Sequence, residues 1–328
     1  MKSWKSPSRN PSAIRRAAGF SLVELMVAML LSLLLSAAAV SLFVSNKRVY
    51  GATEGLSRLQ ENSRMAYELM ARDIREAGGN PCDVRMTLVN VLSDTVNWWA
   101  IYDAGISGFD NGTHPDSAAG TDAIRIQYFE DTGLVTTGSM GGATGPLPVN
   151  DTSGIINRQI MLACGFFPSS PTEPVTDAAV IFSAGTAAGA VTHVQANANA
   201  RDDFSTATHP VAVVYPEGSL LGRLRALEWY VGDNADGGTS LFRRQLQYGG
   251  GAPALGAPEE VVPDVTDLQL SYMDNTGAWS AGLPASWNNV TAVQVEMEME
   301  ARDSRAGAVE GELITRELVH VIALRNKL

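Results

Sequence analysis

Residues 20–44, FSLVELMVAMLLSLLLSAAAVSLFV, decide the architecture of this chain. They contain a single charged side chain, Glu24. A helix rises by about 1.5 Å per residue, so this stretch would be about 37 Å long. That length is enough to cross the apolar part of a bilayer with some tilt. The sequence therefore predicts a transmembrane helix at residues 20–44.

The segment before this stretch is basic. Residues 1–19 carry five positive side chains and no acidic one: Lys2, Lys5, Arg9, Arg15 and Arg16. Positive residues next to a first apolar segment stay on the cytoplasmic side of the membrane. We therefore expect a single-pass protein of a bacterial inner membrane, with the bulk of the chain in the periplasm.

Three interpretations of this N-terminal region compete. In a secretory signal peptide, Ala37-Ala38-Ala39 would serve a signal peptidase, but the apolar run is longer than is usual there. A plain membrane anchor accounts for the length and the flanking charge, but not for Glu24. A carboxylate inside a membrane helix costs at least a few kcal/mol and is rarely found there without a partner. The third interpretation supplies that partner.

The string GFSLVELMVAML at residues 19–30 resembles the class III signal of type IV pilins and type II secretion pseudopilins. The resemblance implies that a prepilin peptidase cuts between Gly19 and Phe20 and that Phe20 is then N-methylated. Glu24 would be the fifth mature residue and would pair with the N-terminal amine of a neighbouring subunit. Two charges that are each costly in hydrocarbon become tolerable when they neutralise one another.

A second resemblance lies in residues 56–82, LSRLQENSRMAYELMARDIREAGGNPC, and in the C-terminal HVIALRNKL. Both are similar to minor pilins of the PilW type, and more distantly to pseudopilins of the GspJ type. This implies a role in priming type IV pilus assembly and a place at or near the fibre tip. The implied partners are other minor pilins, the major pilin, the prepilin peptidase, the inner-membrane assembly platform and membrane lipid. A type II secretion pseudopilin and a membrane-anchored periplasmic adhesin or binding protein remain the alternatives.

The helix is predicted to continue beyond the membrane, because no proline occurs between Pro11 and Pro81. Apolar residues then recur at helical steps, and the run Gly78-Gly79-Asn80-Pro81 ends the pattern. The stripe comprises Leu56, Leu59, Ala66, Met70, Ile74 and Ala77. The predicted division is a cleaved leader at 1–19, a transmembrane helix at 20–44, its amphipathic continuation at 45–79, and a β-rich periplasmic head at 80–328.

In the head the apolar period changes to two, which indicates half-buried strands. Such alternation occurs at 124–128, 211–215, 227–231, 268–272 and 293–299, whereas 318–324 is apolar enough for a strand buried on both faces. We predict an α+β, pilin-like fold in which the long helix packs on an antiparallel sheet. Stretches rich in glycine, alanine and threonine at 132–154 and 183–200 are predicted to be long loops, which leaves open whether the head has one lobe or two.

The chain has two cysteines, Cys82 and Cys164, both in the predicted periplasmic part. In an oxidising compartment the favoured interpretation is one structural disulfide, and the alternative is two unpaired buried thiols. On the chain-entropy model, closing a loop of this size stabilises the fold by about 4 kcal/mol.

The remaining motifs give little support for bound ligands or catalysis. Asp233, Asn234 and Asp236 in DNADGG are oxygen donors of the kind calcium prefers, but the spacing of an EF-hand is absent and a hairpin turn is favoured. The segment FDNGTHPD at 109–116 is also predicted to be a surface turn. No nucleophile motif, phosphate-binding loop or metal motif occurs, so we expect a non-catalytic protein without cofactors. From Phe20 onward the chain holds 19 basic and 35 acidic residues, a formal charge of −16, and general nucleic-acid binding is not expected.

Overall fold

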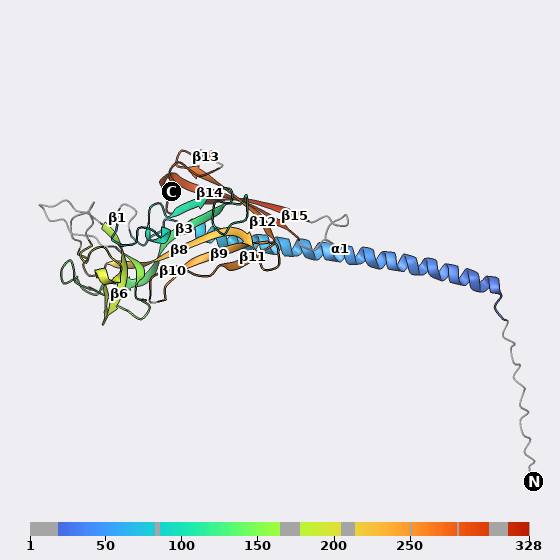
Figure 1. The fold of residues 1–328 in the computed structure, drawn as a ribbon, viewed down its shortest axis with the longest axis horizontal. Coiled ribbons are helices and arrows are strands. Elements are labelled where there is room, and N and C mark those ends of the chain that lie inside the picture. Colours follow the sequence, from blue (N-terminus) through green and yellow to red (C-terminus); the bar gives the residue numbers. More distant parts are fainter. Residues whose placement is uncertain are drawn as a thin grey trace, which may run out of the picture.

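A computed structural model describes residues 19–82, 86–164, 178–204, 214–249, 251–280, 282–301 and 314–327. A single long helix, α1 (Leu22–Glu76), projects from a β-rich head, and its far end bears the N-terminus (Figure 1). At 55 residues it is about 82 Å long. The prediction of one continuous helix through the apolar stretch and beyond it is confirmed. The α+β class with antiparallel sheets is confirmed as well.

The strands and short helices of the head follow α1 in chain order. Those of the larger sheet are β1 (Thr87–Asn90), β2 (Ile106–Phe109), β3 (Ala123–Val135), β4 (Leu147–Pro148), β5 (Gln159–Cys164), β6 (Ala178–Ala187), β7 (Ala190–Thr192), β8 (Leu220–Asp233), β9 (Thr239–Gln247), β10 (Ala254–Leu255) and β11 (Glu259–Pro263). Those of the smaller sheet are β12 (Val265–Asp274), β13 (Trp279–Ser280), β14 (Val290–Glu300) and β15 (Thr315–Ala323). Three 3₁₀ turns are η1 (Trp98–Ala100), η2 (Gln195–Asn197) and η3 (Trp287–Asn289).

Within the described residues these strands form two sheets. The larger has 11 strands, with the central order β10-β9-β8-β5-β6-β7-β4, and the smaller has the order β13-β12-β14-β15. Pairing is antiparallel apart from β1, which runs parallel to β6. The long strands β3 and β8 pair along most of their length, so one continuous sheet connects the part of the head beside α1 to its distal part.

The second half of α1 is buried between these two sheets. Its inward residues share one apolar core with strands of both sheets, including Trp229 of β8 and Met297 of β14. The buried residues of α1 are Gly55, Leu59, Ser63, Ala66, Met70, Ala71, Asp73 and Ile74. The predicted stripe is therefore confirmed except at Leu56, which is 41% exposed. The stripe begins one residue earlier, at Gly55, and Leu56 is rotated away from the head.

Two glycines end α1 and turn the chain onto the sheet. Gly78 has φ +71°, a left-handed conformation that glycine adopts readily at a helix C-terminus. Its amide donates to Gln127 O at 2.9 Å, and the amide of Phe129 donates to Gly79 O at 2.7 Å. The segment that leaves the helix is thus held directly against β3.

A buried carboxylate also fixes α1 to the larger sheet. Asp73 is 2% exposed, and its Oδ2 accepts a hydrogen bond from Trp229 Nε1 at 3.1 Å. Arg243 Nη1 lies 3.8 Å from the same oxygen. Burial raises the pKa of Asp73, while Arg243 and Trp229 act in the opposite direction. This contact gives the ARDIR run a structural role, because its aspartate joins the helix to β8 and β9.

Three expectations about the head are wrong in detail. Residues 318–323 form part of β15, an edge strand, and Val319 and Val321 are 46% and 54% exposed because one face of this strand points away from α1. The stretch 183–200 is not a long loop throughout, since it holds the end of β6 and all of β7, where small side chains allow tight packing. Residues 227–231 are buried on both faces rather than one.

Of the expected strand at 211–215, residues 211–213 lie outside the described residues.

The 109–116 segment is a turn, as expected, but its histidine is buried rather than on the surface. His114 Nε2 lies 3.3 Å from Oε2 of Glu228, a residue of β8 that is 0% exposed. Arg125 Nε pairs with the same oxygen at 3.0 Å, and Arg244 Nε donates to Oε1 at 2.6 Å. Burial alone would raise the pKa of Glu228, but the contacts from His114, Arg125 and Arg244 lower it to about 2. The carboxylate is therefore ionised and joins β3, β8, β9 and the turn.

We predict that Glu228→Gln lowers the free energy of unfolding by about 3 kcal/mol, because it leaves the largely buried guanidinium group of Arg125 without its counter-charge and removes the buried carboxylate from Arg244, which keeps its pair with Asp116. The folded-state pKa of Glu228 lies below its ordinary value of 4.5, so this contribution is present above pH 4.5 and disappears as the pH falls toward 2. Denaturant titrations of the full chain in detergent at several pH values measure the difference in unfolding free energy between the variant and the unaltered protein. The exposed residue Glu298 provides the control, and Glu298→Gln should change stability by less than about 0.5 kcal/mol. Equal stability of the two variants at pH 7 would contradict this account.

Candidate processing and assembly site

The predicted cleavage point lies in an open stretch before α1. Phe20 is 80% exposed, and a β-carbon added at Gly19 would meet no atom within 4 Å. Gly19 also lacks the positive φ that would favour glycine. Nothing in the described part of the chain therefore requires glycine at position 19, so a requirement for it would come from an enzyme that binds this segment.

Glu24 lies in the first turn of α1. The helix is capped by Ser21, whose hydroxyl oxygen accepts a hydrogen bond from the Glu24 amide at 3.2 Å. The cap uses only the backbone of Glu24, and the residue is exposed. A carboxylate near a helix N-terminus is favoured by the helix dipole. The local structure therefore presents a negative charge at the start of a long apolar surface.

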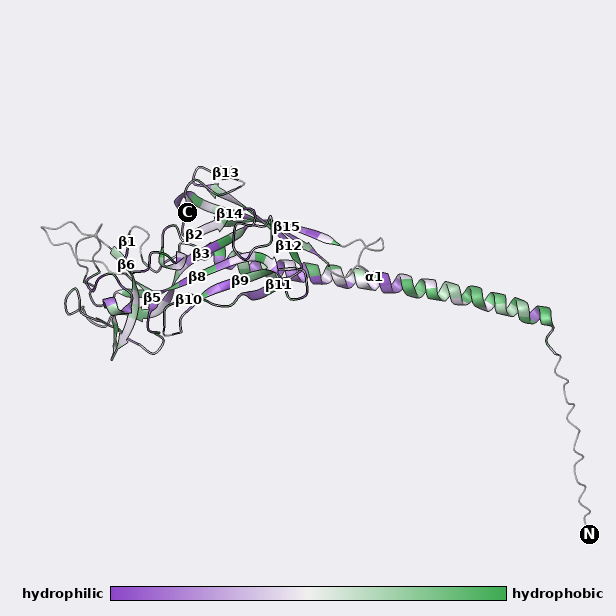
Figure 2. Ribbon diagram, in the orientation of Figure 1, coloured by the Kyte–Doolittle hydropathy of each residue, from purple (hydrophilic) through white to green (hydrophobic). Residues whose placement is uncertain are grey.

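That apolar surface is not covered by the head. In the described part of the chain, α1 is the one helix long and apolar enough to cross a membrane. None of the residues in its most apolar stretch is buried. Phe20, Leu22, Leu33, Leu35 and Phe43 are each more than two-thirds exposed. Figure 2 shows the same division, with hydrophobic residues in the free half of α1 and mixed residues toward the head. Such a surface needs lipid or other apolar helices around it.

The comparison with family models agrees with this geometry. Residues 14–40 match the prokaryotic N-terminal methylation motif. This motif indicates a type IV pilin-like or pseudopilin-like protein with a class III prepilin signal. The match covers the segment that contains Gly19, Phe20 and Glu24, together with most of the apolar segment 20–44. The motif and the helix also fit a membrane-anchored protein. No curated protein matches the chain.

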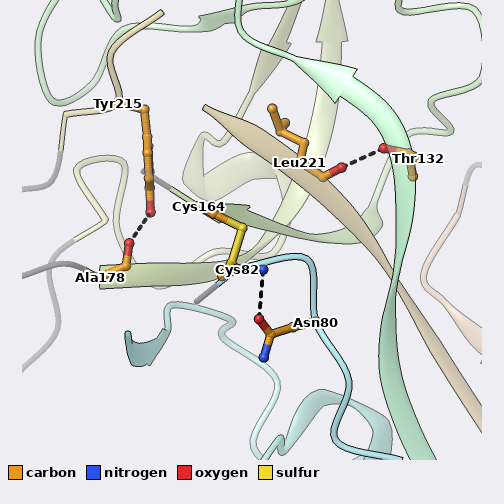
Figure 3. The surroundings of a disulfide bond; sticks show 7 residues. All are labelled: Asn80, Cys82, Thr132, Cys164, Ala178, Tyr215 and Leu221. Carbon is orange, nitrogen blue, oxygen red and sulfur yellow. Dashed lines mark hydrogen bonds between the residues drawn. A yellow bond between two sulfur atoms is a disulfide. The ribbon is translucent and has the colours of Figure 1, made fainter. Parts of the chain in front are cut away.

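The two cysteines are joined in the structure, as the favoured interpretation predicted. Cys82 and Cys164 form a disulfide with 5.4 Å between their Cα atoms and a sequence separation of 82. Figure 3 shows Asn80 beside this bond, and its side-chain oxygen accepts a hydrogen bond from the Cys82 amide at 2.9 Å. Cys164 is the last residue of β5, which pairs with both β6 and β8. The disulfide therefore connects the exit of α1 to the centre of the distal sheet.

The surroundings of the disulfide are well packed. Tyr215 is fully buried, and its hydroxyl donates to Ala178 O at 3.2 Å, at the start of β6. Thr132 Oγ1 donates to Leu221 O at 2.6 Å across β3 and β8 (Figure 3). These hydrogen bonds hold the strands on either side of Cys164.

The DNADGG loop forms the turn between β8 and β9. Asn234 Oδ1 accepts hydrogen bonds from the amides of Asp236 and Gly238 at 3.1 and 3.0 Å, and Asn234 Nδ2 donates to Ser240 Oγ at 2.7 Å. The asparagine oxygen thus stabilises the turn rather than facing outward as a ligand. No group of three or more His, Cys, Asp and Glu side chains that could hold a metal ion occurs within the described ranges.

Sequence reasoning did not find the cluster around Glu228. The sequence predicts a surface turn at 109–116, which contains His114, and the alternation at 227–231 predicts that Glu228 is exposed. The signal that could have found it is the presence of charged residues on neighbouring strands, Arg125 on β3 and Arg244 on β9, in register with Glu228.

We predict that Gly19→Val leaves the precursor uncut. The substitution does not disturb the chain, since the position is open, so the defect would arise at the peptidase. Cleavage is measured by the intact mass and the N-terminal sequence of protein recovered from membranes, in strains with and without the prepilin peptidase. The unaltered protein should begin at N-methylated Phe20, and only when the peptidase is present.

Gly154→Val is a matched control, because Gly154 is also open and lacks a positive φ. It should be processed normally. An unaltered chain that begins near Val40, or that retains Met1 in both strains, would contradict the assignment of the cleavage site.

We also predict that replacing both Cys82 and Cys164 by serine lowers the free energy of unfolding by about 4 kcal/mol, because the unfolded chain regains the freedom of an 82-residue loop. Denaturant titration without a reducing agent measures the difference. The unaltered protein in excess reductant should approach the stability of the double variant. Equal stability of oxidised and reduced protein would rule out this contribution.

Proposed function

We propose that this protein is a minor pilin of the PilW type, which takes part in priming type IV pilus assembly and lies at or near the tip of the fibre. Its role is structural rather than catalytic. It associates through α1 with other minor pilins and with the major pilin, and the head makes further contacts. The prepilin peptidase, the inner-membrane assembly platform and membrane lipid are its other partners.

The observation that carries the proposal is the uncovered half of α1 with Glu24 at its start. In the membrane, lipid covers this surface, and in a fibre the helices of neighbouring subunits would replace the lipid. Glu24 then needs a positive partner, because an unpaired carboxylate among apolar helices is costly. Once Phe20 is the first residue, its amine supplies a positive charge in each subunit, and methylation leaves that charge in place.

The second half of α1 supports the minor-pilin assignment. The motifs LQEN and ARDIR, which resemble those of PilW-type proteins, lie where α1 enters the head. Asp73 of ARDIR is the buried partner of Trp229, so this part of the resemblance coincides with the contact that sets the head on the helix. Nothing in this contact favours a soluble or enzymatic role.

A type II secretion pseudopilin would use the same leader and helix. The two proposals differ in the assembly that depends on the protein. Deletion of the gene should abolish or sharply reduce surface fibres if the minor-pilin proposal is correct, and should block protein secretion with fibres intact if the pseudopilin alternative is correct.

We predict that Glu24→Ala leaves processing and membrane insertion intact but weakens co-purification with partner pilins by about tenfold or more, the effect of losing roughly 1.4 kcal/mol. The loss follows because the neighbouring amine would remain charged without a counter-charge. Fibre counts and quantitative co-purification from membranes measure it.

Glu61→Ala is the matched control, since Glu61 is an exposed acid on the same helix outside the apolar segment. It should assemble as well as the unaltered protein. Normal fibre number and normal co-purification for Glu24→Ala would disprove the pairing of charges, even if the protein is confirmed to be processed as a prepilin.

A further inference from the structure

A cavity of about 570 Å³ opens on the larger sheet at β8 and β9. β8 contributes Arg223 and Arg225, β9 contributes Arg243, Gln245 and Gln247, and β11 contributes Glu259. These strands lie side by side in Figure 1, and β11 lies beside the part of α1 that enters the head. A volume of this size is typical of sites for small ligands. The cavity plays no part in the association through α1 proposed above.

Two of the arginines share one carboxylate. Arg223 Nη2 and Arg225 Nε donate to the same oxygen, Glu130 Oε2, at 2.7 and 2.8 Å. Burial alone would raise the pKa of Glu130, but the two arginines lower it, so the carboxylate is ionised. Two guanidinium groups against one carboxylate leave one positive charge in excess. This local charge contrasts with the strongly acidic chain around it.

One of the two arginines of β8 also has a donor without a partner. Each guanidinium has five N–H donors and no acceptor. Arg223 Nε is buried and has no hydrogen-bond partner among the described residues. Leaving such a donor unpaired costs about 1–3 kcal/mol, so its presence needs an explanation.

Arg243, at the other side of the cavity, is already satisfied. Its Nη2 donates to Glu259 Oε2 at 3.0 Å. The amide oxygen of Gln245, in the orientation that completes its hydrogen bonds, accepts from Nε and Nη2 of Arg243 at 2.9 Å. The unpartnered donor, Nε of Arg223, therefore belongs to the side of the cavity that β8 forms.

The cavity wall is shaped by close packing of the loop after β10. The end of the Gln247 side chain lies close against Gly256, within 2.6 Å of where a β-carbon would stand. The amide of Gly256 donates to Gln245 O at 2.9 Å. The loop is thereby held beside the polar residues of β9, with Glu259 at its far end.

We propose that this cavity binds a small polar ligand through a carboxylate, which lies against Arg223 and Arg225. The planar fork of a guanidinium group matches the two oxygens of a carboxylate. The single excess positive charge matches one carboxylate, whereas a doubly charged phosphate would face Glu130 and Glu259 as well. The amides of Gln245 and Gln247 and the carboxylate of Glu259 are suited to hydroxyl groups on the same ligand. The matching class is therefore a carboxylated sugar or a similar hydroxy acid.

Thermal unfolding of the full processed chain in detergent micelles tests this, with sodium D-glucuronate and sodium acetate as probes. Ligands that bind the folded state raise the unfolding midpoint in a concentration-dependent manner. The midpoint should rise and saturate with glucuronate, rise less with acetate, and stay unchanged with D-glucose or with sodium chloride at equal ionic strength. Absence of a response to both carboxylates would overturn the proposal. A response to inorganic phosphate as large as that to glucuronate would overturn the assignment of a carboxylate.

Variants then locate the site. Arg225→Gln should weaken glucuronate binding about tenfold or more, since a charge-assisted hydrogen bond is lost. Arg225→Lys keeps the charge beside Glu130 but loses the fork, so it should fold like the unaltered protein and bind glucuronate with intermediate affinity. Arg316→Gln, on β15 of the smaller sheet, is the control and should bind normally. Equal binding by Arg225→Lys, Arg225→Gln and Arg316→Gln would exclude this cavity as the site.

Discussion

The fold depends on the burial of one face of α1 between residues 55 and 77. That face is the apolar layer that both sheets share, with Met70 and Ile74 packed among residues of β8, β12 and β14. Removing a large apolar side chain from such a core typically costs about 2–5 kcal/mol. Since the same helix continues without a break into the free apolar half, the packing of this face also sets the direction in which the head projects from the membrane.

Polar contacts make this packing specific. The bond from Trp229 to Asp73 fixes the rotation of the helix about its axis, and Gly78 and Gly79 fix where it ends relative to β3. Six residues after the last residue of α1, Cys82 is joined to the end of β5. The distal part of the sheet is thus connected to the helix by a covalent bond as well as through β3 and β8. A fibre subunit that is held only by its helix would transmit any load on the head through these same connections.

Much of this arrangement could be predicted from the sequence, because local sequence patterns determine it. The length of α1, the alternation in β12 and β14, and the pairing of Cys82 with Cys164 follow from periodicity, composition and cysteine number. What could not be predicted depends on contacts between distant segments. The apolar residues of β15 gave no sign that Val319 and Val321 lie on the outer face of an edge strand, since composition does not reveal which strand lacks a neighbour. Glu228 alternates with apolar residues as a surface residue would, and only its proximity to Arg125 and Arg244 explains why it is buried.

At the start of α1, the backbone of Glu24 takes part in the helix cap and its side chain does not. A helix needs acceptors for its first amides, and Ser21 provides one through the backbone of Glu24. The carboxylate of Glu24 is not consumed by this cap, although a glutamate three residues after a capping serine is well placed to turn back toward it. The charge therefore stays at the surface of the apolar segment, where lipid offers it nothing. In the proposed assembly, a second helix would bring a positive group to this charge and lower its free energy. Association between subunits, rather than folding of one subunit, would then offset the cost of the charge.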